Sequence, residues 1–513
     1  ASPFFGGGTP AAASPEASAP GSPCSSQCLG GSPQRLGSPQ KQPSARSLSF
    51  GGFTPGGGLG RERAPPSEVD AFTQETLARC VRGSVAVSVV TAPAHAEALD
   101  VSRAQWLAWR TGGDVLHMPG FGPAMQAELE DNLQHWSRKA EDSAYGCVFK
   151  IRCSKGLSCR SMVAPWPAAA SSEDASAFEL PRMSPDATVT FVLSHEPEEP
   201  EEDDYWRLRN RNHKSMYVQT VVLHTNRRGQ RLLRVHNTAV LVTASMRQVF
   251  GGVSIAPLMA VMLKQACLLA LTQRISGSTK VLPRDFLLEF CLQALTSYLR
   301  HCGPSKSSAG CLVLGRRLCL LPLYTLAARK LLFLLTGGQG RQEEGEARLR
   351  SILRMPVHSI VSALYPRVYT LPADPAAPLP APEHPTLAEY MASGLSPDAR
   401  LVFSSLGSWI DLPSRQGDAA PPELSQELWQ SAEELSARLC NSQGAAAAFP
   451  PVRWLPRGGG AGLGSSLFDG ASWEDKVLLS ALFVEDDGAT EMGYPEWVHF
   501  LQEELARRAC ERE

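Results

Sequence analysis

The stretch SMYVQTVVLHTNRRGQRLLRVHNTAVLVT at residues 215–243 predicts a long β-hairpin. Its two arms are rich in β-branched and apolar residues, and polar residues recur at a period close to two. This is the period of a strand with one buried face. Asn226–Gly229 lies between the arms, and Asn and Gly are typical residues of a tight turn between two strands.

Two segments before the hairpin have the same period, GCVFKIRCS at 146–154 and ATVTFVLS at 187–194. Together with the hairpin they predict an antiparallel β-sandwich, which we assign to residues 131–245. The acidic run Glu196–Asp204 interrupts it, and a solvated loop is the favoured interpretation of such a charge run.

The segment before the sandwich divides into two parts. Residues 1–66 consist mainly of Gly, Ala, Ser and Pro with few aliphatic residues, which predicts a disordered low-complexity segment. Residues 67–130 show a helix, a strand, a short helix and the strand DVLHM at 114–118. We interpret them as the C-terminal part of an α/β trunk domain.

The segment after the sandwich also divides into two parts. At 246–355 apolar residues recur at the three- and four-residue spacing of buried helices. At 356–513 helical and strand-like runs alternate, and an amphipathic helix ends the chain. The predicted fold class is therefore α+β multidomain: the end of an α/β trunk, a β-sandwich, a helical domain and a small αβ domain.

Composition excludes several functions. The 513 residues contain 49 Lys and Arg against 51 Asp and Glu, a net charge of -2, so no global basic field would attract nucleic acid. The thirteen cysteines are scattered, mostly in apolar stretches, which is typical of reduced thiols in the cytosol. The chain begins at Ala1 without an initiator Met, and we expect it to be a piece of a longer protein.

Signatures of enzymes and metal sites are missing from the sequence. It contains no Gly-x-Ser-x-Gly, His-Glu-x-x-His or phosphate-binding Gly-rich motif, so we expect no enzyme. Cys24 and Cys28 have no second pair at zinc-finger distance, and we expect no zinc there. The hairpin turn carries a basic cluster, Arg227, Arg228, Arg231 and Arg234. A solvated turn is its favoured interpretation, with an acidic partner or a lipid head group as alternatives.

Six phrases, taken in order, resemble the cargo-adaptor subunit family of the inner COPII vesicle coat. They are TGGDVLHMPGF at 111–121, FKIRCSKGLS at 149–158, MYVQTVVLHTNRRGQRLLRVHN at 216–237, LCLLPLYTLAARK at 318–330, MPVHSIVSALYPRVYTL at 355–371 and LFVEDDGATEMGYPEWVHFLQEEL at 482–505.

The resemblance implies the C-terminal part of such a subunit, with a gelsolin-like domain at 356–513. It implies no catalytic activity and no cofactor in this chain, because the family's zinc finger would lie upstream. It implies as partners the sister inner-coat subunit, the small GTPase of the coat and the cytosolic tails of cargo and cargo receptors. It also implies a cytoplasmic protein peripheral on the endoplasmic reticulum membrane and on COPII vesicles.

Three residues of the phrase at 149–158 are candidates for cargo binding. By resemblance, the Leu after the Gly of this phrase lines a cargo pocket between trunk and sandwich, which here is Leu157. Arg152 and Lys155 are the basic groups that could meet a cargo carboxylate. The competing interpretation makes Leu157 a sandwich-core residue and Arg152 a solvated strand residue.

Two rival functions remain open. One is the sister subunit, which has the same domain order and stimulates the GTPase with an inserted arginine. The other is a degenerate scaffold that keeps the fold without cargo capture. The motif at Tyr145–Cys147 and the acidic insert at 196–204 depart from the family's pattern and indicate a divergent or truncated adaptor.

Overall fold

The computed structural model describes residues 68–93, 102–118, 121–164, 176–185, 187–195, 215–243, 245–276, 281–303, 312–337, 342–371, 399–411, 426–442, 452–455 and 492–510. All of these residues belong to one compact unit, Pro55–Glu513. The predicted low-complexity segment at 1–66, the cysteines at 24 and 28 and the acidic run at 196–204 lie outside the described residues.

The trunk part contains the strand–helix–strand unit that the sequence predicts. β1 and β2 pair in parallel, Val89 opposite Val115, and α2 connects them. One helix, α3, was missed, because its sequence is mostly polar and its apolar stripe is thin. The elements are α1 (Glu68–Gly83), β1 (Val89–Thr91), α2 (Ser102–Thr111), β2 (Val115–His117), the 3-10 helix η1 (Pro123–Met125) and α3 (Gln126–Asp142).

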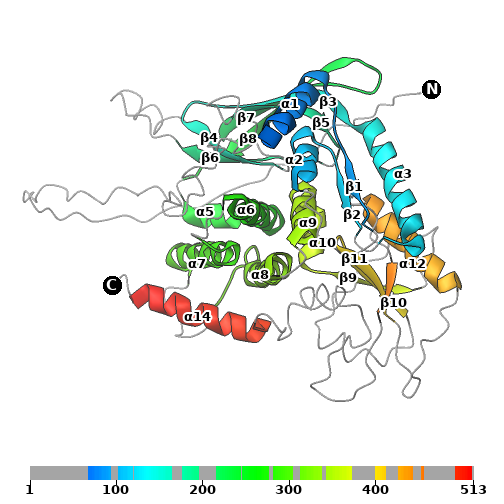
Figure 1. Ribbon diagram of the computed structural model, residues 1–513. Helices are drawn as coiled ribbons and strands as arrows, with labels where there is room; N and C mark the ends of the chain where they lie inside the picture. Colours follow the sequence, from blue (N-terminus) through cyan, green and yellow to red (C-terminus); the bar gives the residue numbers. More distant parts are fainter. Residues whose placement is uncertain are drawn as a thin grey trace, which may run out of the picture. The chain divides into compact units, whose positions relative to one another are not determined.

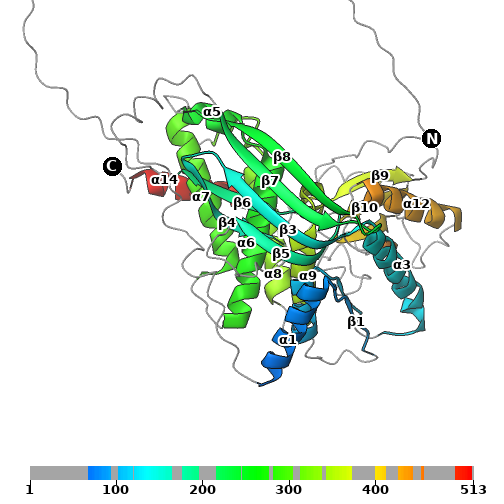
Figure 2. The same cartoon turned by 90° about the horizontal axis from the view of Figure 1, so that it is seen from above.

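The β-sandwich consists of a four-stranded antiparallel sheet and a two-stranded one. Figure 2 shows the larger sheet face on, in the order β5-β3-β7-β8, and the smaller sheet pairs β4 with β6. The strands are β3 (Ala144–Cys153), β4 (Leu157–Val163), β5 (Ala177–Met183), β6 (Thr190–His195), β7 (Ser215–Thr225) and β8 (Arg231–Leu241).

The predicted hairpin is confirmed, and local chemistry explains its turn. The Asn226 side-chain oxygen accepts the backbone N–H groups of Arg228 and Gln230, each at 3.0 Å. Gly229 has φ +74°, a left-handed conformation that glycine adopts at low cost. The turn therefore fixes the pairing of β7 with β8, and all eleven pairs from Thr225–Arg231 to Ser215–Leu241 follow without a shift.

Aromatic stacking joins the two sheets. The Phe149 ring lies 5.2 Å from Phe178 of β5 and 5.4 Å from Phe191 of β6, measured between ring centroids. Because β6 belongs to the smaller sheet, the face of β3 that carries Phe149 points into the sandwich core. Such stacked aromatic pairs are worth about 0.5–1.5 kcal/mol beyond the area that they bury.

The predicted helical domain follows. In α6 the residues Met259, Leu263 and Cys267 are fully buried, which gives the four-residue spacing of a core-facing stripe. Within the described residues, no helix is both long enough and apolar enough to cross a membrane. The helices are α5 (Met246–Gly251), α6 (Ile255–Ser276), α7 (Pro283–Cys302), α8 (Leu321–Gly337) and α9 (Gln342–Arg354).

The last part contains a small mixed sheet in the order β12-β11-β10-β9. One face of the sheet packs on α12, and Tyr369, Phe403 and Leu435 lie in the shared core. The elements are α10 (Val357–Leu364), β9 (Arg367–Leu371), β10 (Ala399–Ser404), β11 (Gly407–Asp411), α12 (Gln426–Ser442), β12 (Val452–Leu455) and α14 (Tyr494–Cys510).

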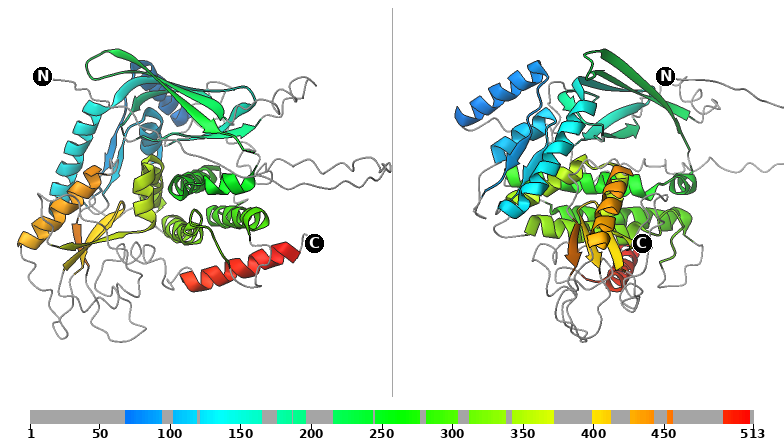
Figure 3. Two further views of the ribbon diagram at one scale, coloured as in Figure 1. Left: turned by 180° about the vertical axis from the view of Figure 1, so that it is seen from behind. Right: turned by 90° about the vertical axis from the view of Figure 1, so that its right-hand side faces the viewer.

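The C-terminal helix α14 packs on the helical domain. Figures 1 and 3 show it beside α7 and α8. Buried Trp497 donates its Nε1–H to the Pro322 carbonyl oxygen at 3.0 Å. Arg508 makes a two-pronged ion pair with Glu289, with N–O distances of 3.0 and 2.6 Å. The final residues of the chain thus complete a domain that begins about half-way along it.

A buried lysine joins the sandwich to the helical domain. Lys264 of α6 is 3% exposed and donates to the Thr188 hydroxyl, which precedes β6. The same hydroxyl lies 3.3 Å from the Met355 carbonyl oxygen. Burial lowers the pKa of Lys264 to about 8, since desolvation disfavours the ammonium form, and nearby Cys267 opposes that shift.

We predict that Lys264→Met changes the pH dependence of stability. An unfolded lysine has a pKa near 10.4, so between about pH 8 and 10 the unfolded chain holds a proton that folded Lys264 has lost. Stability of the original chain should therefore rise across this range relative to Lys264→Met. Urea unfolding at pH 7, 8, 9 and 10 measures the difference. Exposed Lys150→Met is the control, and parallel pH profiles for the original chain and Lys264→Met would contradict the prediction.

Candidate functional site

The three predicted cargo-binding residues lie within one tight turn between β3 and β4. Arg152 is near the end of β3, Lys155 is in the turn and Leu157 begins β4. The turn closes with a hydrogen bond from the Leu157 N–H to the Ser154 carbonyl oxygen at 3.1 Å. Gly156 has φ +85°, so a residue with a Cβ would be strained there. The glycine in the phrase at 149–158 is thus required by the turn itself.

The turn is fastened to the start of β7. The Ser154 N–H donates to the Tyr217 carbonyl oxygen at 2.9 Å, and the Tyr217 N–H donates to the Ser154 hydroxyl oxygen, also at 2.9 Å. Beyond the turn, the Ser158 and Ser194 hydroxyls lie 3.0 Å apart across β4 and β6. These bonds fix the point where the chain leaves the larger sheet and enters the smaller one, which is at Leu157.

The three residues are neighbours in the sequence, but the structure gives their side chains different surroundings. Arg152 and Lys155 are exposed, and Leu157 is half-buried. Strand β4 contacts β6, β3 and helix α6, whereas α1 and α2 of the trunk part contact the sandwich at β5. A cargo pocket between trunk and sandwich at Leu157 therefore stays a prediction.

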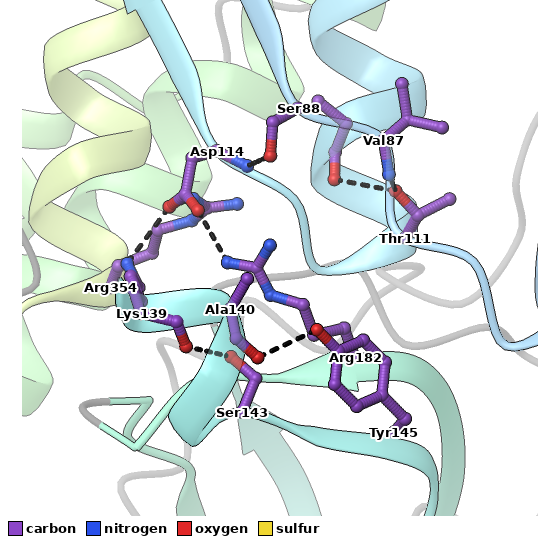
Figure 4. Close-up of polar contacts among 11 residues, drawn as sticks. Val87, Ser88, Thr111, Asp114, Lys139, Ala140, Ser143, Tyr145, Arg182 and Arg354 are labelled. Carbon is purple, nitrogen blue, oxygen red and sulfur yellow. Dashed lines mark hydrogen bonds and ion pairs between the residues drawn. The ribbon is translucent and has the colours of Figure 1, made fainter. Parts of the chain in front are cut away.

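A cluster of charged side chains surrounds Asp114, which sequence reasoning did not single out. Its carboxylate forms ion pairs with three cations (Figure 4), at N–O distances of 3.0 Å to Lys139, 2.6 Å to Arg182 and 2.6 Å to Arg354. Lys139 belongs to α3, Arg182 to β5 and Arg354 to α9. One carboxylate thus joins the trunk part, the sandwich and the helical domain.

The phrase TGGD at 111–114 places this carboxylate. The Thr111 hydroxyl accepts the Val87 N–H at 2.9 Å, and the Asp114 N–H donates to the Ser88 hydroxyl at 3.0 Å (Figure 4). A Cβ on Gly112 would lie 2.0 Å from the Arg182 carbonyl oxygen, and one on Gly113 would lie 1.8 Å from that of Val87. Both glycines are therefore required by close approach of the backbone.

Electrostatics keep Asp114 ionised. Its side chain is 7% exposed, and burial alone would raise its pKa. The charges of Arg354, Lys139 and Arg182 outweigh that effect and hold the pKa well below the ordinary value of an aspartate. Such a carboxylate does not exchange protons near neutral pH, so it suits a structural ion pair better than acid–base catalysis.

A neighbouring contact strengthens the same joint. Arg350, one turn before Arg354 in α9, donates to the Gln105 side-chain oxygen of α2 and pairs with Glu346 at 3.1 Å. Its guanidinium also lies 5.4 Å from the centroid of the Trp109 ring, within cation–π distance. Helix α9 therefore reaches the trunk part through two arginines.

Within the described part of the chain, no group of three His, Cys, Asp or Glu side chains could hold a metal ion. The signal that could have led to Asp114 was its position directly after two glycines and before a strand. Its partners lie 25, 68 and 240 residues away, so no local pattern identifies them.

We predict that Asp114→Asn destabilises the protein by about 3–5 kcal/mol, because it leaves three buried or half-buried cations without their counter-charge. Urea unfolding at pH 7 measures this. The difference from the original chain should shrink as the pH falls below about 4, where the unfolded aspartate takes up its proton. The control is Glu141→Gln, because the pair of Glu141 with Arg227 is exposed and should be worth less than about 1 kcal/mol. Equal effects of the two variants would contradict the prediction.

Comparison with known proteins identifies both central domains. Residues 144–243 match the family model of the Sec23/Sec24 β-sandwich domain, and residues 256–362 match that of the Sec23/Sec24 helical domain.

Relatives and a solved structure point the same way. The chain is 24% identical over 264 residues to protein transport protein Sec24A of Bos taurus, covering 50% of this chain and 22% of that protein. It is 24% identical over 315 residues to SEC24 A of Arabidopsis thaliana, covering 61% and 28%. The chain thus spans less than a third of the length of these relatives.

The crystal structure of the human COPII-coat protein Sec24c matches with a TM-score of 0.64 at 20% identity, over 87% of this chain and 54% of that one. That likeness confirms the predicted multidomain fold. With these two domains in the expected order and Sec24 relatives at 24% identity, the chain contains the β-sandwich and helical domains of the Sec23/Sec24 family and is similar to the C-terminal part of Sec24 proteins.

Proposed function

We propose that the chain is part of a non-enzymatic COPII coat subunit that selects cargo for transport from the endoplasmic reticulum to the Golgi. The observation that carries this proposal is the consecutive pair of Sec23/Sec24 domains, joined to a fold like that of the COPII-coat protein Sec24c. The names of the curated relatives, protein transport proteins, support the same role.

The proposed partners follow from this role. They are the sister inner-coat subunit, the small GTPase of the coat and the cytosolic tails of cargo and cargo receptors. The protein would act in the cytoplasm, peripherally on the endoplasmic reticulum membrane and on COPII vesicles. The Asp114 cluster supports a scaffold of this kind, because it fixes three parts of the chain to one another while offering no group for catalysis.

We place cargo recognition at the turn between β3 and β4. Leu157 would supply the apolar wall, and Arg152 and Lys155 would pair with a cargo carboxylate. Support comes from the rigidity of the turn, which the bonds between Ser154 and Tyr217 hold in place. A rigid turn with exposed cations can bind a short peptide without ordering itself first.

We predict that Leu157→Trp blocks the apolar wall and reduces capture of at least one class of cargo tails in a vesicle-budding assay. Leu320→Trp is the matched control, because Leu320 is a partly exposed leucine in the turn before α8. If Leu157→Trp and Leu320→Trp package every cargo as the original chain does, cargo capture does not occur at Leu157. A scaffold without cargo capture would then be favoured.

Affinity purification through a C-terminal tag tests the coat role itself. We expect the sister coat subunit to co-purify, because the chain contains the domains of a coat subunit. A purification without any coat subunit would contradict the proposal. Stimulation of GTP hydrolysis that is lost on replacing one arginine would instead favour the sister-subunit role.

A further inference from the structure

Strand β8 is an exposed edge of the larger sheet. It ends the order β5-β3-β7-β8, and no other described strand pairs with its outer side. It runs for eleven residues, and its ladder with β7 has no shift that would mark a bulge. Exposed edges are usually blunted by shortness, proline, a bulge or charged side chains. Strand β8 is neither short nor bulged and contains no proline, and its charged residues are Arg231 and Arg234. All of its residues except Leu232 are exposed.

The backbone of β8 presents free hydrogen-bonding groups in a fixed register. The Asn226 N–H donates to the Gln230 carbonyl oxygen, which makes this a hydrogen-bonded pair at the turn. Hydrogen-bonded and non-hydrogen-bonded pairs alternate in an antiparallel ladder. The odd-numbered residues of β8 therefore point their N–H and C=O groups away from β7. Tyr217, opposite Ala239, agrees, because both of its backbone groups bond to Ser154 on the β3 side.

Apolar side chains lie on the outer face of the sheet, beside the outward backbone groups of β8. Phe149 faces the core, so its neighbour Val148 faces outward, as do Leu223 and Leu233 beside it in the register. Leu233 is 62% exposed, Val235 46% and Leu241 80%. In Figure 2 no described helix covers β7 and β8 on this side. Exposed apolar residues along an edge with free amides are the features of a surface for strand addition.

Charge indicates what kind of segment would bind there. Residues 215–243 contain four arginines and no Asp or Glu. Arg227 pairs with Glu141, and Arg231 bonds to the Gly146 carbonyl oxygen at 2.6 Å. Arg228 and Arg234 are also exposed on this hairpin. A partner must therefore bring acidic side chains as well as apolar ones.

We propose that β8 is a docking edge for an extended, acidic and apolar segment of another protein, which adds to the larger sheet as a fifth strand. Backbone bonds to the odd-numbered residues would supply the register, and Arg228 and Arg234 would favour an acidic partner. This inference goes beyond the proposed function and uses none of the residues assigned to cargo. A second copy is disfavoured, because its β8 carries the same positive charge. A lipid surface is disfavoured, because it would leave the edge amides without matching partners.

The test uses the full chain and a fluorescent eight-residue peptide of alternating Val and Glu. We expect saturable binding by fluorescence anisotropy that weakens with salt, whereas a Val–Lys peptide of the same length should not bind. Hydrogen exchange read at single residues gives the decisive signature. Binding should protect the amides of Leu233, Val235, Asn237 and Ala239, while the even-numbered amides of β8, already bonded to β7, change little.

Matched variants distinguish the contribution of the β8 backbone to peptide binding from that of its side chains. Val235→Pro removes one outward N–H without touching the ladder to β7 and should weaken binding about tenfold, the value of roughly one hydrogen bond. Val235→Ala keeps the N–H and should weaken binding less. Arg228→Glu with Arg234→Glu should abolish binding, and Arg316→Glu, on an exposed turn elsewhere, should not.

Other outcomes overturn the proposal. Equal binding of the two peptides, or binding without protection of the odd-numbered amides, rules out strand addition. Protection that grows with protein concentration and needs no peptide indicates a second copy. If the peptide does not raise the anisotropy signal but the protein binds anionic vesicles, the surface binds lipid instead. Leu157→Trp should leave peptide binding intact, so a failure of the cargo proposal and a failure of this one are distinguishable.

Discussion

One buried carboxylate connects three parts of the described chain. Asp114 meets Lys139, Arg182 and Arg354 within hydrogen-bonding distance, from a helix of the trunk part, a strand of the sandwich and a helix of the helical domain. Each cation would be costly to bury alone, so the carboxylate stabilises the docking of all three elements. Directional ion pairs therefore specify an arrangement that apolar packing alone would leave less defined.

We propose binding at two surfaces of the sandwich, the turn at 154–156 and strand β8. The contacts at Asp114 and Lys264 join the sandwich to its neighbours through Arg182 of β5 and through Thr188 before β6, and neither contact involves the turn at 154–156 or strand β8. Both surfaces combine apolar side chains with exposed cations. A protein that binds extended segments needs little more than a rigid sheet to present them.

Sequence reasoning predicted the elements whose signal is local. The hairpin around Asn226 and the buried helical stripe of α6 follow from periodicity and turn chemistry, and the structure confirms them. Helix α3 was missed because its apolar stripe is weak. Asp114 was quoted within a phrase, but its role depends on partners up to 240 residues away, and no sequence period reports that. The candidate Leu157 came from resemblance, and Arg152 and Lys155 were chosen as basic residues of the same phrase. Both are exposed, and exposed basic residues are common on any protein surface.

The packing of α14 on α7 and α8 has a consequence for synthesis in the cell. Trp497 fills a site beside Pro322, 175 residues earlier, so that surface stays uncovered while the ribosome makes the whole β9–β12 region. At about 5–20 residues per second, this delay lasts on the order of ten to thirty seconds. The helical domain therefore reaches its final packing only after helix α14 has left the ribosome. During that interval, a molecular chaperone that shields apolar helix surfaces has a defined place to act.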